Sequence, residues 1–599
     1  MALKFLLFVF LDFKGNTFAF EPEAIKDDIT GFMEFSPYGL ENVLKTTEDS
    51  EEIELEGEFE SETTQALFAE LIDGVIYRNG PGKFEFGNTS FGHIFDPSAI
   101  LSATRIRDGK VFFRQRFVQS SNFKNNTENS RIIKPEVGTY AEPDDITTDK
   151  NGNAYGRREV FKNRRKFLFE EGLSTDNTVV NVMHVAGHLM SLTDSSYRHL
   201  HDFETLETKD RIDINYSPNI PHGIFCMTTS SHPVLDKETG DLWDMAGCLD
   251  FMTNEYNIPK IHIHPIVWRG VGHPKSQYPT PWTKEQILSS IEFGPAIDSP
   301  KWPDHPSAMP YFHSLARAGK YLILPVGGTV LDMIPMLKNG IRKKKPMIES
   351  LMFLNTSPAR FLIFDREKME WESVQPLAQA FSHFHVVNSF IDEQDQLNID
   401  IIEANPNVMQ ALELDNLKTT KNEYLEIWSS IIPSGKPVRF ILGKRREEFL
   451  QWADVVQSPG ITPSLNFPCF ENGGIDFPVL NPLHYGKDYK HYWTCGFGEL
   501  LSDRIYYVNM ETGERKIYRV PNYHFSEPVF LTPEKDDLSE NQGVIASTAS
   551  PLNPEDRAFI VFLNASTMKE VARFYFPQGF KVPISFHGNY YRREETTIN

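Results

Sequence analysis

The chain has 599 residues, of which 40% are hydrophobic and 24% are charged, so it can bury a large core. Its formal net charge is −22, from 82 acidic and 60 basic residues, and so acidic a chain repels the phosphate backbone of nucleic acids. Composition therefore predicts no nucleic-acid partner, and no stretch reaches the roughly 18 apolar residues of a membrane-spanning helix.

Residues 1–22 form an N-terminal apolar segment that has two interpretations. Lys4 and the apolar run Phe5–Leu11, with Thr17–Ala19 as a cleavage site, have the pattern of a short secretory signal sequence. Asp12 and Lys14 interrupt this pattern, and the run is at the lower length limit for such a signal. We expect either a cytoplasmic or peripherally membrane-associated protein, or one that enters the secretory pathway.

Short apolar strands alternate with tight turns along the rest of the chain. Residues 45–66 are acidic and residues 121–156 are rich in Asn, Asp, Thr and Gly, so both stretches are predicted to be exposed loops. Helices are predicted at Thr64–Ile72, Thr283–Ser290 and Arg445–Val456. The pattern as a whole predicts an all-β fold.

One turn signature recurs along the chain. An apolar strand runs into Asp or Asn, a short polar turn follows, and a second strand returns, starting from Asp202, Asp236, Asp365, Asn509 and Asn564. Asp and Asn favour such turns because their side chains accept hydrogen bonds from the backbone just ahead. Repeated antiparallel hairpins indicate the radial repetition of a β-propeller, with an array of β-sandwiches as the alternative.

The four cysteines are Cys226, Cys248, Cys469 and Cys495, and none of them forms a CxxC pair. Their spacing predicts neither a thiolate zinc site nor a disulfide framework, so a reducing compartment fits best.

Four of the 18 histidines share one context, at strand ends in apolar or aromatic surroundings. They are His232 in TTSSHPVLD, His313 in MPYFHSLA, His385 in FSHFHVVNSF and His587 in ISFHGNYY. Singly, each is explained as a hydrogen-bonded core histidine. A propeller, however, brings the inner strands of distant blades to one axis, where four neutral imidazoles would suit a divalent transition metal such as Fe(II).

A second histidine pair, His262 and His264 in IHIHP, lies on one face of a predicted strand. A pair without a third ligand is more often an exposed strand face, so we assign it no metal.

The four histidine motifs resemble those of the carotenoid cleavage oxygenases, the family that includes the animal β-carotene oxygenases and the retinoid isomerohydrolase of the retinal pigment epithelium. RNGPG at residues 78–82 and FGHIFD at residues 91–96 are similar to the family's N-terminal signature, with Pro97 where the family usually has Gly. The His-Pro, Phe-His-Ser, His385-x-x-Asn388 and Phe-His-Gly contexts match the family's four iron-ligand motifs in order. The resemblance covers nearly the whole chain.

The resemblance implies a single domain over residues 23–599, a seven-bladed β-propeller with a few short helices and long loops that cap one face. Fe(II) would lie on the central axis, bound by His232, His313, His385 and His587 without a protein carboxylate. O₂ would be the co-substrate, and no catalytic residue beyond the metal site is implied.

Metal-bound imidazoles need an acceptor on the second ring nitrogen, and the family supplies three glutamates for this purpose. Glu527 in FSEPVF matches the third, whereas Asp476 in GIDFP and Asp194 in LTDSS stand at the second and first, each with an arm shorter by about 1.5 Å. Either the backbone moves inward, a water bridges the gap, or the contact is loose, and Asp194 has an ordinary turn as its alternative. Thr193 matches a threonine that crowds the open iron site in the family.

The resemblance implies oxidative cleavage of one C=C bond in a carotenoid or apocarotenoid, which yields aldehydes or ketones such as retinal. Two alternatives remain: non-oxidative isomerisation and hydrolysis of a retinyl ester at the same iron, and a non-catalytic carotenoid-binding propeller. Because carotenoids dissolve in bilayers, we also expect peripheral membrane binding through an apolar patch. Ile224–Met227 is the candidate contact, with an ordinary buried strand as its alternative.

Overall fold

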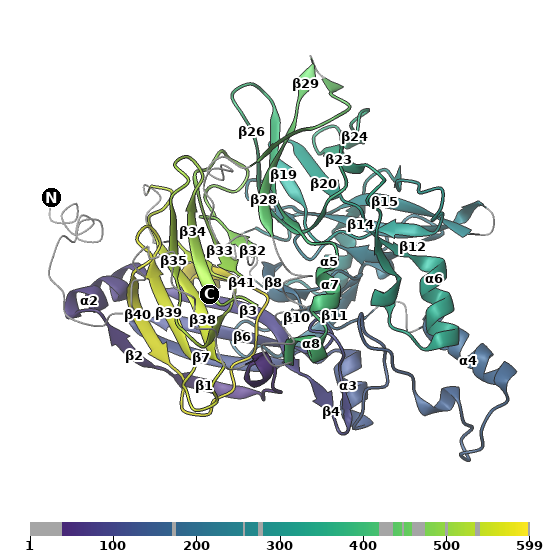
Figure 1. Ribbon diagram of the computed structural model, residues 1–599, viewed down its shortest axis with the longest axis horizontal. Coiled ribbons are helices and arrows are strands. Elements are labelled where there is room, and N and C mark those ends of the chain that lie inside the picture. The colour runs from purple at the N-terminus through teal and green to yellow at the C-terminus, as the bar shows by residue number, and fades with distance from the viewer. Residues whose placement is uncertain are drawn as a thin grey trace, which may run out of the picture.

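Strands dominate the computed structural model, and a few short helices accompany them (Figure 1). The all-β prediction is therefore confirmed. The N-terminal segment 1–22 and Cys469 lie outside the residues that the structure describes, so the predictions made for them stay predictions. The described residues are 39–170, 175–255, 258–273, 280–418, 435–445, 448–457, 474–497, 501–532 and 539–596.

Seven sheets of four to six strands make up most of the described chain. Within each sheet, most strands pair antiparallel with strands close to them in sequence, as the recurring hairpins predicted. In chain order the sheets comprise residues 50–117 with 587–592, 181–213, 224–298, 316–378, 382–457, 475–518, and 523–575 with 56–59.

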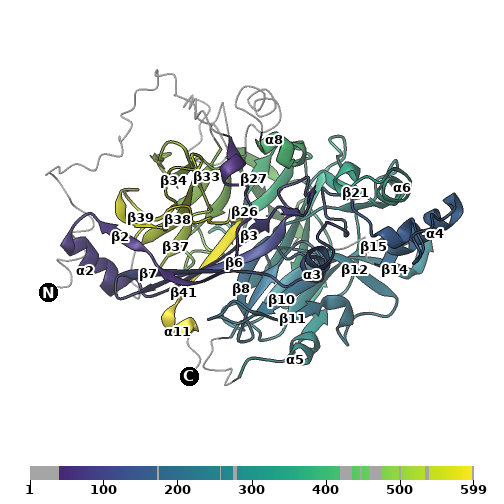
Figure 2. The same cartoon turned by 90° about the horizontal axis from the view of Figure 1, so that it is seen from below.

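The two ends of the described chain join each other's sheets. The last strand, β41 (His587–Arg592), pairs with β3 (Gly74–Lys83) in the first of the seven sheets. In exchange, β2 (Glu56–Phe59) pairs with β40 (Glu570–Tyr575) at the edge of the last sheet. Figure 2 shows β41 beside β3. This closure sets His587 directly opposite Asn79 in the strand pairing.

Apolar faces of consecutive sheets pack against each other to form the core. One cluster joins Trp493 and Ile505 of the sheet at 475–518 to Phe530 and Phe559 of the following sheet. Burying each of these side chains contributes roughly 1.5–3 kcal/mol. Strands with one solvated face show the expected alternation, as in β7 (Lys110–Phe117), where every second residue of KVFFRQRF is buried.

The turn signature forms hairpins at all five predicted positions. In each, the Oδ1 atom of the first residue accepts the backbone N–H two residues ahead, at Asp202, Asp236, Asp365, Asn509 and Asn564. The residue four positions after each Asp or Asn has a positive φ, between 56° and 75°. Glycine supplies this conformation in two hairpins, and Leu or Met supplies it in three, at a strain of about 1–2 kcal/mol each.

Two of the three predicted helices are confirmed, as α2 (Glu62–Leu71) and α5 (Lys284–Ser289). A capping box between Thr283 and Gln286 starts α5. Among the residues that the structure describes, the sequence patterns missed these α-helices: α3 (Ser121–Glu128), α4 (Arg157–Glu170), α6 (Met333–Lys338), α7 (Val408–Ala411), α8 (Leu414–Lys418) and α11 (Arg593–Thr596). None of the helices in the described part of the chain combines the length and apolarity that crossing a bilayer requires.

Three local predictions were wrong. The acidic stretch 45–66 contains β1 (Ser50–Glu54) and β2. These are edge strands: β1 pairs with β7 in the first sheet, and β2 pairs with β40 in the last. For the stretch 121–156 the prediction was wrong in the first eight residues, which form α3, whereas most of residues 129–156 are irregular as predicted. The predicted helix Arg445–Val456 is replaced by short strands, of which β31 (Asp454–Gln457) pairs with β28 (Lys436–Leu442). Pairing with a sheet edge outweighs a weak local helical pattern.

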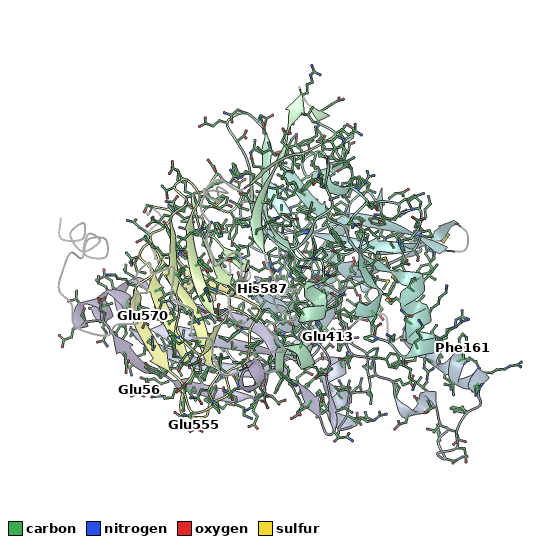
Figure 3. All side chains as sticks on the ribbon, in the orientation of Figure 1. Glu56, Phe161, Glu413, Glu555, Glu570 and His587 are labelled. Carbon is green, nitrogen blue, oxygen red and sulfur yellow. A yellow bond between two sulfur atoms is a disulfide. The ribbon has the colours of Figure 1, made fainter. Side chains whose placement is uncertain are left out.

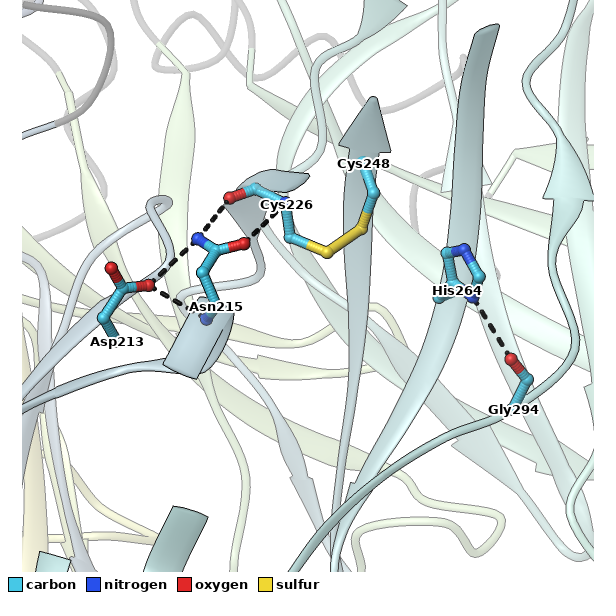
Figure 4. The surroundings of a disulfide bond; sticks show 6 residues. All are labelled: Asp213, Asn215, Cys226, Cys248, His264 and Gly294. Carbon is cyan, nitrogen blue, oxygen red and sulfur yellow. Dashed lines mark hydrogen bonds between the residues drawn. A yellow bond between two sulfur atoms is a disulfide. The ribbon is translucent and has the colours of Figure 1, made fainter. Parts of the chain in front are cut away.

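The cysteine prediction also needs correction, because Cys226 and Cys248 form a disulfide (Figure 4). They face each other on β12 (Ile224–Thr229) and β14 (Leu242–Glu255), a juxtaposition that register creates and sequence spacing does not reveal. Asn215 holds the backbone of Cys226 through two hydrogen bonds of 2.8 and 2.9 Å. Cys495 is a free, buried thiol.

Candidate metal centre

Four imidazoles from distant parts of the chain meet inside the molecule, where Figure 3 labels His587. Their ligand nitrogens all lie within 4.8 Å of one another, and no other such group of His, Cys, Asp and Glu occurs among the described residues. His232 follows β12, His313 lies between β18 (Ala308–Pro310) and β19 (Ala316–Ala318), His385 lies on β26 (Ser382–Ile391), and His587 begins β41.

Three of the four rings have a carboxylate on the Nδ1 atom. His385 Nδ1 lies 2.7 Å from Asp476 Oδ1, and His587 Nδ1 lies 2.9 Å from Glu527 Oε1. His313 Nδ1 lies 2.9 Å from Asp194 Oδ2. An ionised carboxylate can only accept a hydrogen bond, so Nδ1 carries the proton in each ring whose carboxylate is ionised. The Nε2 atoms are then left with lone pairs directed into the cluster.

These lone pairs face each other at short range. Nε2 of His587 lies 3.2 Å from Nε2 of both His385 and His232, and Nε2 of His232 lies 3.2 Å from that of His313. Burial, and then the neighbouring imidazoles, hold the pKa values of His232 and His587 well below the usual range. His232 and His587 therefore stay neutral, and their Nε2 lone pairs face each other at 3.2 Å. Four neutral imidazole nitrogens in this arrangement fit a divalent transition-metal ion.

Asp476 reaches His385 directly because the main chain leaves regular strand geometry at this point. The pairing of β32 (Ile475–Val479) with β33 (His491–Gly496) shifts register directly after Asp476. The next residue, Phe477, has a φ of 58°, which bulky residues rarely adopt, and its N–H donates to Asp476 Oδ1 at 2.8 Å. The irregular backbone thus directs the short carboxylate at the ring, and no bridging water is required.

Asp194 collects three donors. His313 Nδ1 contacts both of its oxygens, the Ser231 hydroxyl donates to Oδ1 at 2.5 Å, and the Tyr311 hydroxyl donates to Oδ2 at 2.9 Å. Burial raises the pKa of Tyr311 well above its usual range, so the phenol stays a donor. An ordinary turn residue does not account for these contacts. Ser231 and Tyr311 were missed from the sequence, although they lie one and two residues before His232 and His313.

His232 is held differently from the other three rings. Its Nδ1 lies 3.5 Å from Asn181 Nδ2, longer than an ordinary hydrogen bond. The main chain is fixed instead: the backbone N–H of His232 donates to Ser230 Oγ at 2.8 Å, and that hydroxyl donates to the carbonyl of His313 at 2.7 Å. One serine therefore ties two of the histidine segments together.

The RNGPG signature at residues 78–82 lies against the last strand. Asn79 Nδ2 donates to the carbonyls of Thr178 and Asn181, at 2.7 and 2.9 Å, and so connects β3 to the sheet at 181–213. Gly80 is required by close approach, because a Cβ there would lie 2.3 Å from the carbonyl oxygen of Ile584. The signature holds the chain segment that leads into His587.

The Glu527 carboxylate is deeply buried, which raises its pKa to about 7. The N–H of Gly588 donates to its Oε2 at 3.0 Å and partly offsets this shift. A cation bound by His587 would favour the ionised form further, since opposite charges stabilise each other at short range.

A cavity of about 220 Å³ adjoins the histidine cluster. His313, His385 and His587 line it, and Thr193 and Asp194 form part of the same wall. Most of the remaining surface is apolar, with side chains such as Ile94, Phe95, Val137, Phe384, Met409 and Leu412. An apolar chamber beside a cluster of donor atoms suits a hydrophobic ligand.

The pair His262 and His264, on β15 (Ile258–Trp268), has protein partners outside this cluster. His264 Nδ1 lies 3.2 Å from the carbonyl oxygen of Gly294 (Figure 4). His262 Nε2 lies 3.2 Å from Asp298 Oδ1. Each ring therefore has a protein partner within its own sheet, and the pair needs no metal to explain it.

Comparison with known proteins matches most of the chain to one family. The family model described as "Retinal pigment epithelial membrane protein" matches residues 67–592. The mitochondrial carotenoid-cleaving dioxygenase of Macaca fascicularis is 26% identical over 542 residues, which cover 87% of this chain and 90% of that protein. The β,β-carotene 15,15'-dioxygenase of Homo sapiens is 25% identical over 512 residues, which cover 84% and 87%.

Solved structures share the fold. A mutant of the Synechocystis apocarotenoid oxygenase matches with a TM-score of 0.67 and 17% identity, over 92% of this chain and 98% of that one. A cobalt-substituted form of the Synechocystis protein matches with a TM-score of 0.66 and 16% identity, over the same shares. Because the family model spans residues 67–592, the chain belongs to the retinal pigment epithelial membrane protein family, the carotenoid cleavage oxygenases that its histidine motifs predicted.

Proposed function

We propose that the protein is an Fe(II)-dependent dioxygenase that cleaves one C=C bond of a carotenoid or apocarotenoid. Its metal ligands would be His232, His313, His385 and His587. The observation that carries the proposal is the set of four imidazoles whose ligand nitrogens lie close together beside an apolar cavity. Three of these rings are held by a hydrogen bond to a carboxylate. The relatives are named as carotenoid-cleaving dioxygenases, which supports the proposed reaction. The cobalt-substituted form of a structural neighbour supports a metal site.

The reaction adds one O₂ across one double bond: R–CH=CH–R′ + O₂ gives R–CHO and R′–CHO, so each product keeps one oxygen atom. Retinal is one candidate product. When bound, the iron supplies the redox chemistry that O₂ activation needs. The chain itself would contribute binding and exclusion of water: the apolar walls would hold the polyene in register, and Thr193 lines the same cavity as the histidines. Asp194, Asp476 and Glu527 keep the rings in the ligating tautomer.

We also propose that the seven sheets of four to six strands are the blades of a β-propeller with the metal on its axis. The order of the sheets along the chain and the joining of the two chain ends in the first and last sheets support this arrangement. Closure of this kind is how propellers keep their circle of blades intact.

Peripheral membrane binding follows from a bilayer-dissolved substrate. Of the predicted contact Ile224–Met227, Phe225 is 39% exposed, whereas Cys226 and Met227 are buried. The neighbouring strand adds Phe251 and Met252, which are 53% and 65% exposed. The proposed apolar contact is therefore these three side chains.

The test is a cleavage assay in ¹⁸O₂. Purified protein is loaded with Fe(II) without oxygen, given β-carotene in detergent micelles, and quenched early so that aldehyde oxygens do not exchange with water. We expect two carbonyl products, each with one ¹⁸O. A retinoid alcohol without label from a retinyl ester would assign the isomerohydrolase reaction instead. Bound carotenoid with no iron and no product would assign a carrier.

A further inference from the structure

A buried ion pair lies beside the two chain segments that carry Asp194 and His232. Arg198 of β10 (Tyr197–His201) and Asp244 of β14 are each 1% exposed, and Arg198 Nη2 lies 3.3 Å from Asp244 Oδ2. Taking two charges out of water is costly, and neutral side chains of similar size are often equally stabilising. Fold stability alone is therefore a weak reason for this pair, and its contacts indicate a more specific role.

One side of the guanidinium holds the main chain around Asp194. Arg198 Nη1 donates to the carbonyl oxygens of Thr193 and Ser195, at 2.9 and 2.7 Å. A third acceptor is the carbonyl of Tyr197, at 2.8 Å. Because Thr193 and Ser195 flank Asp194 in sequence, one side chain fixes the peptide units on both sides of the carboxylate. All three of these flanking and central residues line the cavity, so Arg198 holds this part of the wall.

The other side of the guanidinium binds the segment that leads to His232. Arg198 Nη2 donates to the hydroxyl of Thr229 and to the carbonyl of Ser230, the latter at 3.1 Å. Asp244 holds the same segment, because its Oδ1 accepts the N–H of Ser230 at 3.1 Å. Both members of the ion pair therefore bind the main chain two residues before His232.

The two segments meet at one carboxylate. The Ser231 hydroxyl donates to Asp194 Oδ1 at 2.5 Å, and His313 Nδ1 lies 2.9 Å from Asp194 Oδ2. The hydroxyl of Thr229 adds a direct link, since it donates to the carbonyl of Ser195 at 2.7 Å. An aspartate side chain is one methylene shorter than a glutamate, so it tolerates less displacement of its main chain. A small shift between the segments would therefore break the contact with the ring.

We propose that Arg198, paired with Asp244, is a positioning residue for the metal centre. It fixes the distance between the two segments and so, through Asp194, the orientation of the His313 ring. A guanidinium suits this task because its planar fork presents donors in two directions, whereas an ammonium is a single point charge. The inference rests on the proposed function only in taking His232 and His313 as metal ligands.

The first test is structural and needs no metal. Arg198→Met with Asp244→Asn removes both charges together, and the amide oxygen introduced at the second position can still accept the N–H of Ser230. A crystal structure of this double variant should show the contact between Asp194 and His313 lengthened from 2.9 Å to beyond ~3.5 Å. An unchanged contact overturns the proposal, whatever reaction the protein catalyses.

Metal affinity is the second test. Metal-free protein is titrated with Co(II) without oxygen, and the visible absorption of bound Co(II) gives both the affinity and a signature of the ligand geometry. The double variant should bind Co(II) about 10–100-fold more weakly, with an altered spectrum. Arg198→Lys should also bind it more weakly, because this variant keeps the charge but cannot span both segments. Wild-type affinity in Arg198→Lys overturns the proposal, since charge alone would then be sufficient.

The matched control is a second buried arginine that binds a carboxylate and backbone carbonyls. Arg105 donates to Glu52 at 2.7 Å and to the carbonyls of Phe203 and Glu204 at 2.9 and 2.8 Å, and none of these residues lines the cavity. Arg105→Met with Glu52→Gln should leave the Co(II) affinity and spectrum unchanged. Thermal unfolding of the metal-free proteins should not separate the two double variants. Equal loss of Co(II) affinity in both would assign the effect to general destabilisation and overturn the proposal.

Cleavage of β-carotene by the Fe(II)-loaded wild type is measured separately. Absence of product would count against the proposed function and leave the crystallographic and Co(II) results standing. A wild type without affinity for Co(II) would refute the ligand set, while the contact between Asp194 and His313 in the double variant would still decide whether Arg198 positions the ring.

Discussion

Each carboxylate at the histidine cluster fixes the tautomer of one imidazole, and two of the three carboxylates are aspartates. Asp476 gains its reach from an irregular backbone at Phe477, and Asp194 is held by Ser231 and Tyr311. The short arms therefore form direct contacts of 2.7 and 2.9 Å with His385 and His313. At both sites the surroundings compensate for the shorter aspartate side chain, so that its carboxylate still reaches the imidazole.

Replacing Asp476 tests this matching. Asp476→Asn keeps the size but removes the charge, so iron affinity or turnover should fall by about 10–100-fold. Asp476→Glu should also lose iron, though less, because the backbone already brings the shorter carboxylate to 2.7 Å. Asp298→Asn, in a His–Asp pair outside the cluster, is the control and should change neither quantity. Equal iron content and rate in Asp476→Asn and wild type would falsify this role for Asp476.

His587→Ala should abolish activity and most iron binding, because removing one of four donors leaves too few to hold the ion in place. His264→Ala should retain both, since His264 bonds to Gly294 outside the cluster. Iron per protein, measured after anaerobic loading and desalting, distinguishes the two. Iron loss in His264→Ala together with retention in His587→Ala would refute the ligand assignment.

Sequence motifs located the four histidines and three carboxylates that the structure brings together, because each motif places its residue next to a strand end. They did not locate Tyr311, Ser231, Ser230 or Asn181. The contacts of these residues depend on how separate sheets approach one another, and nothing in local sequence encodes that distance.

At the scale of elements, the recurring hairpin was predicted well because its cause is local. The Asp or Asn side chain accepts a hydrogen bond from the backbone N–H two residues ahead, so the residues that stabilise the turn are all contained in the signature. The predicted helix Arg445–Val456 failed for the opposite reason, since β31 is stabilised by β28 across the sheet.

Asn564 offers a direct test of the hairpin. Its Oδ1 accepts from the N–H groups of Ser566 and Thr567 at 3.1 and 3.0 Å. Asn564→Ala should lower the free energy of unfolding by about 1–2 kcal/mol through loss of these bonds. Asn564→Asp keeps the acceptor, as three of the other hairpins do, and should stay near wild type. The urea midpoint reports both changes, and an unaltered midpoint in Asn564→Ala would contradict the account.

The disulfide is the second element-scale prediction. Non-reducing peptide mapping should find Cys226 linked to Cys248 and Cys495 as a free thiol. Cys226→Ser with Cys248→Ser should lower the free energy of unfolding by about 2–4 kcal/mol, because the bond closes a loop of 22 residues. Two free thiols at these positions in protein purified without reductant would argue against the bond.

At the scale of the molecule, all-β architecture and family membership followed from the sequence. The pairing of β3 with β41 could not be predicted from local sequence, because it joins residues more than five hundred positions apart and sets Asn79 opposite His587.

The central claim is that one iron ion is held by four imidazoles and by no protein carboxylate. Anomalous diffraction at the iron edge, on crystals of protein loaded anaerobically with Fe(II), tests it most directly. The account predicts a single strong peak within bonding distance of Nε2 of His232, His313, His385 and His587, with Asp194, Asp476 and Glu527 on the far side of their rings. A peak bound by any of these carboxylates, or a peak at His262 and His264, would contradict it.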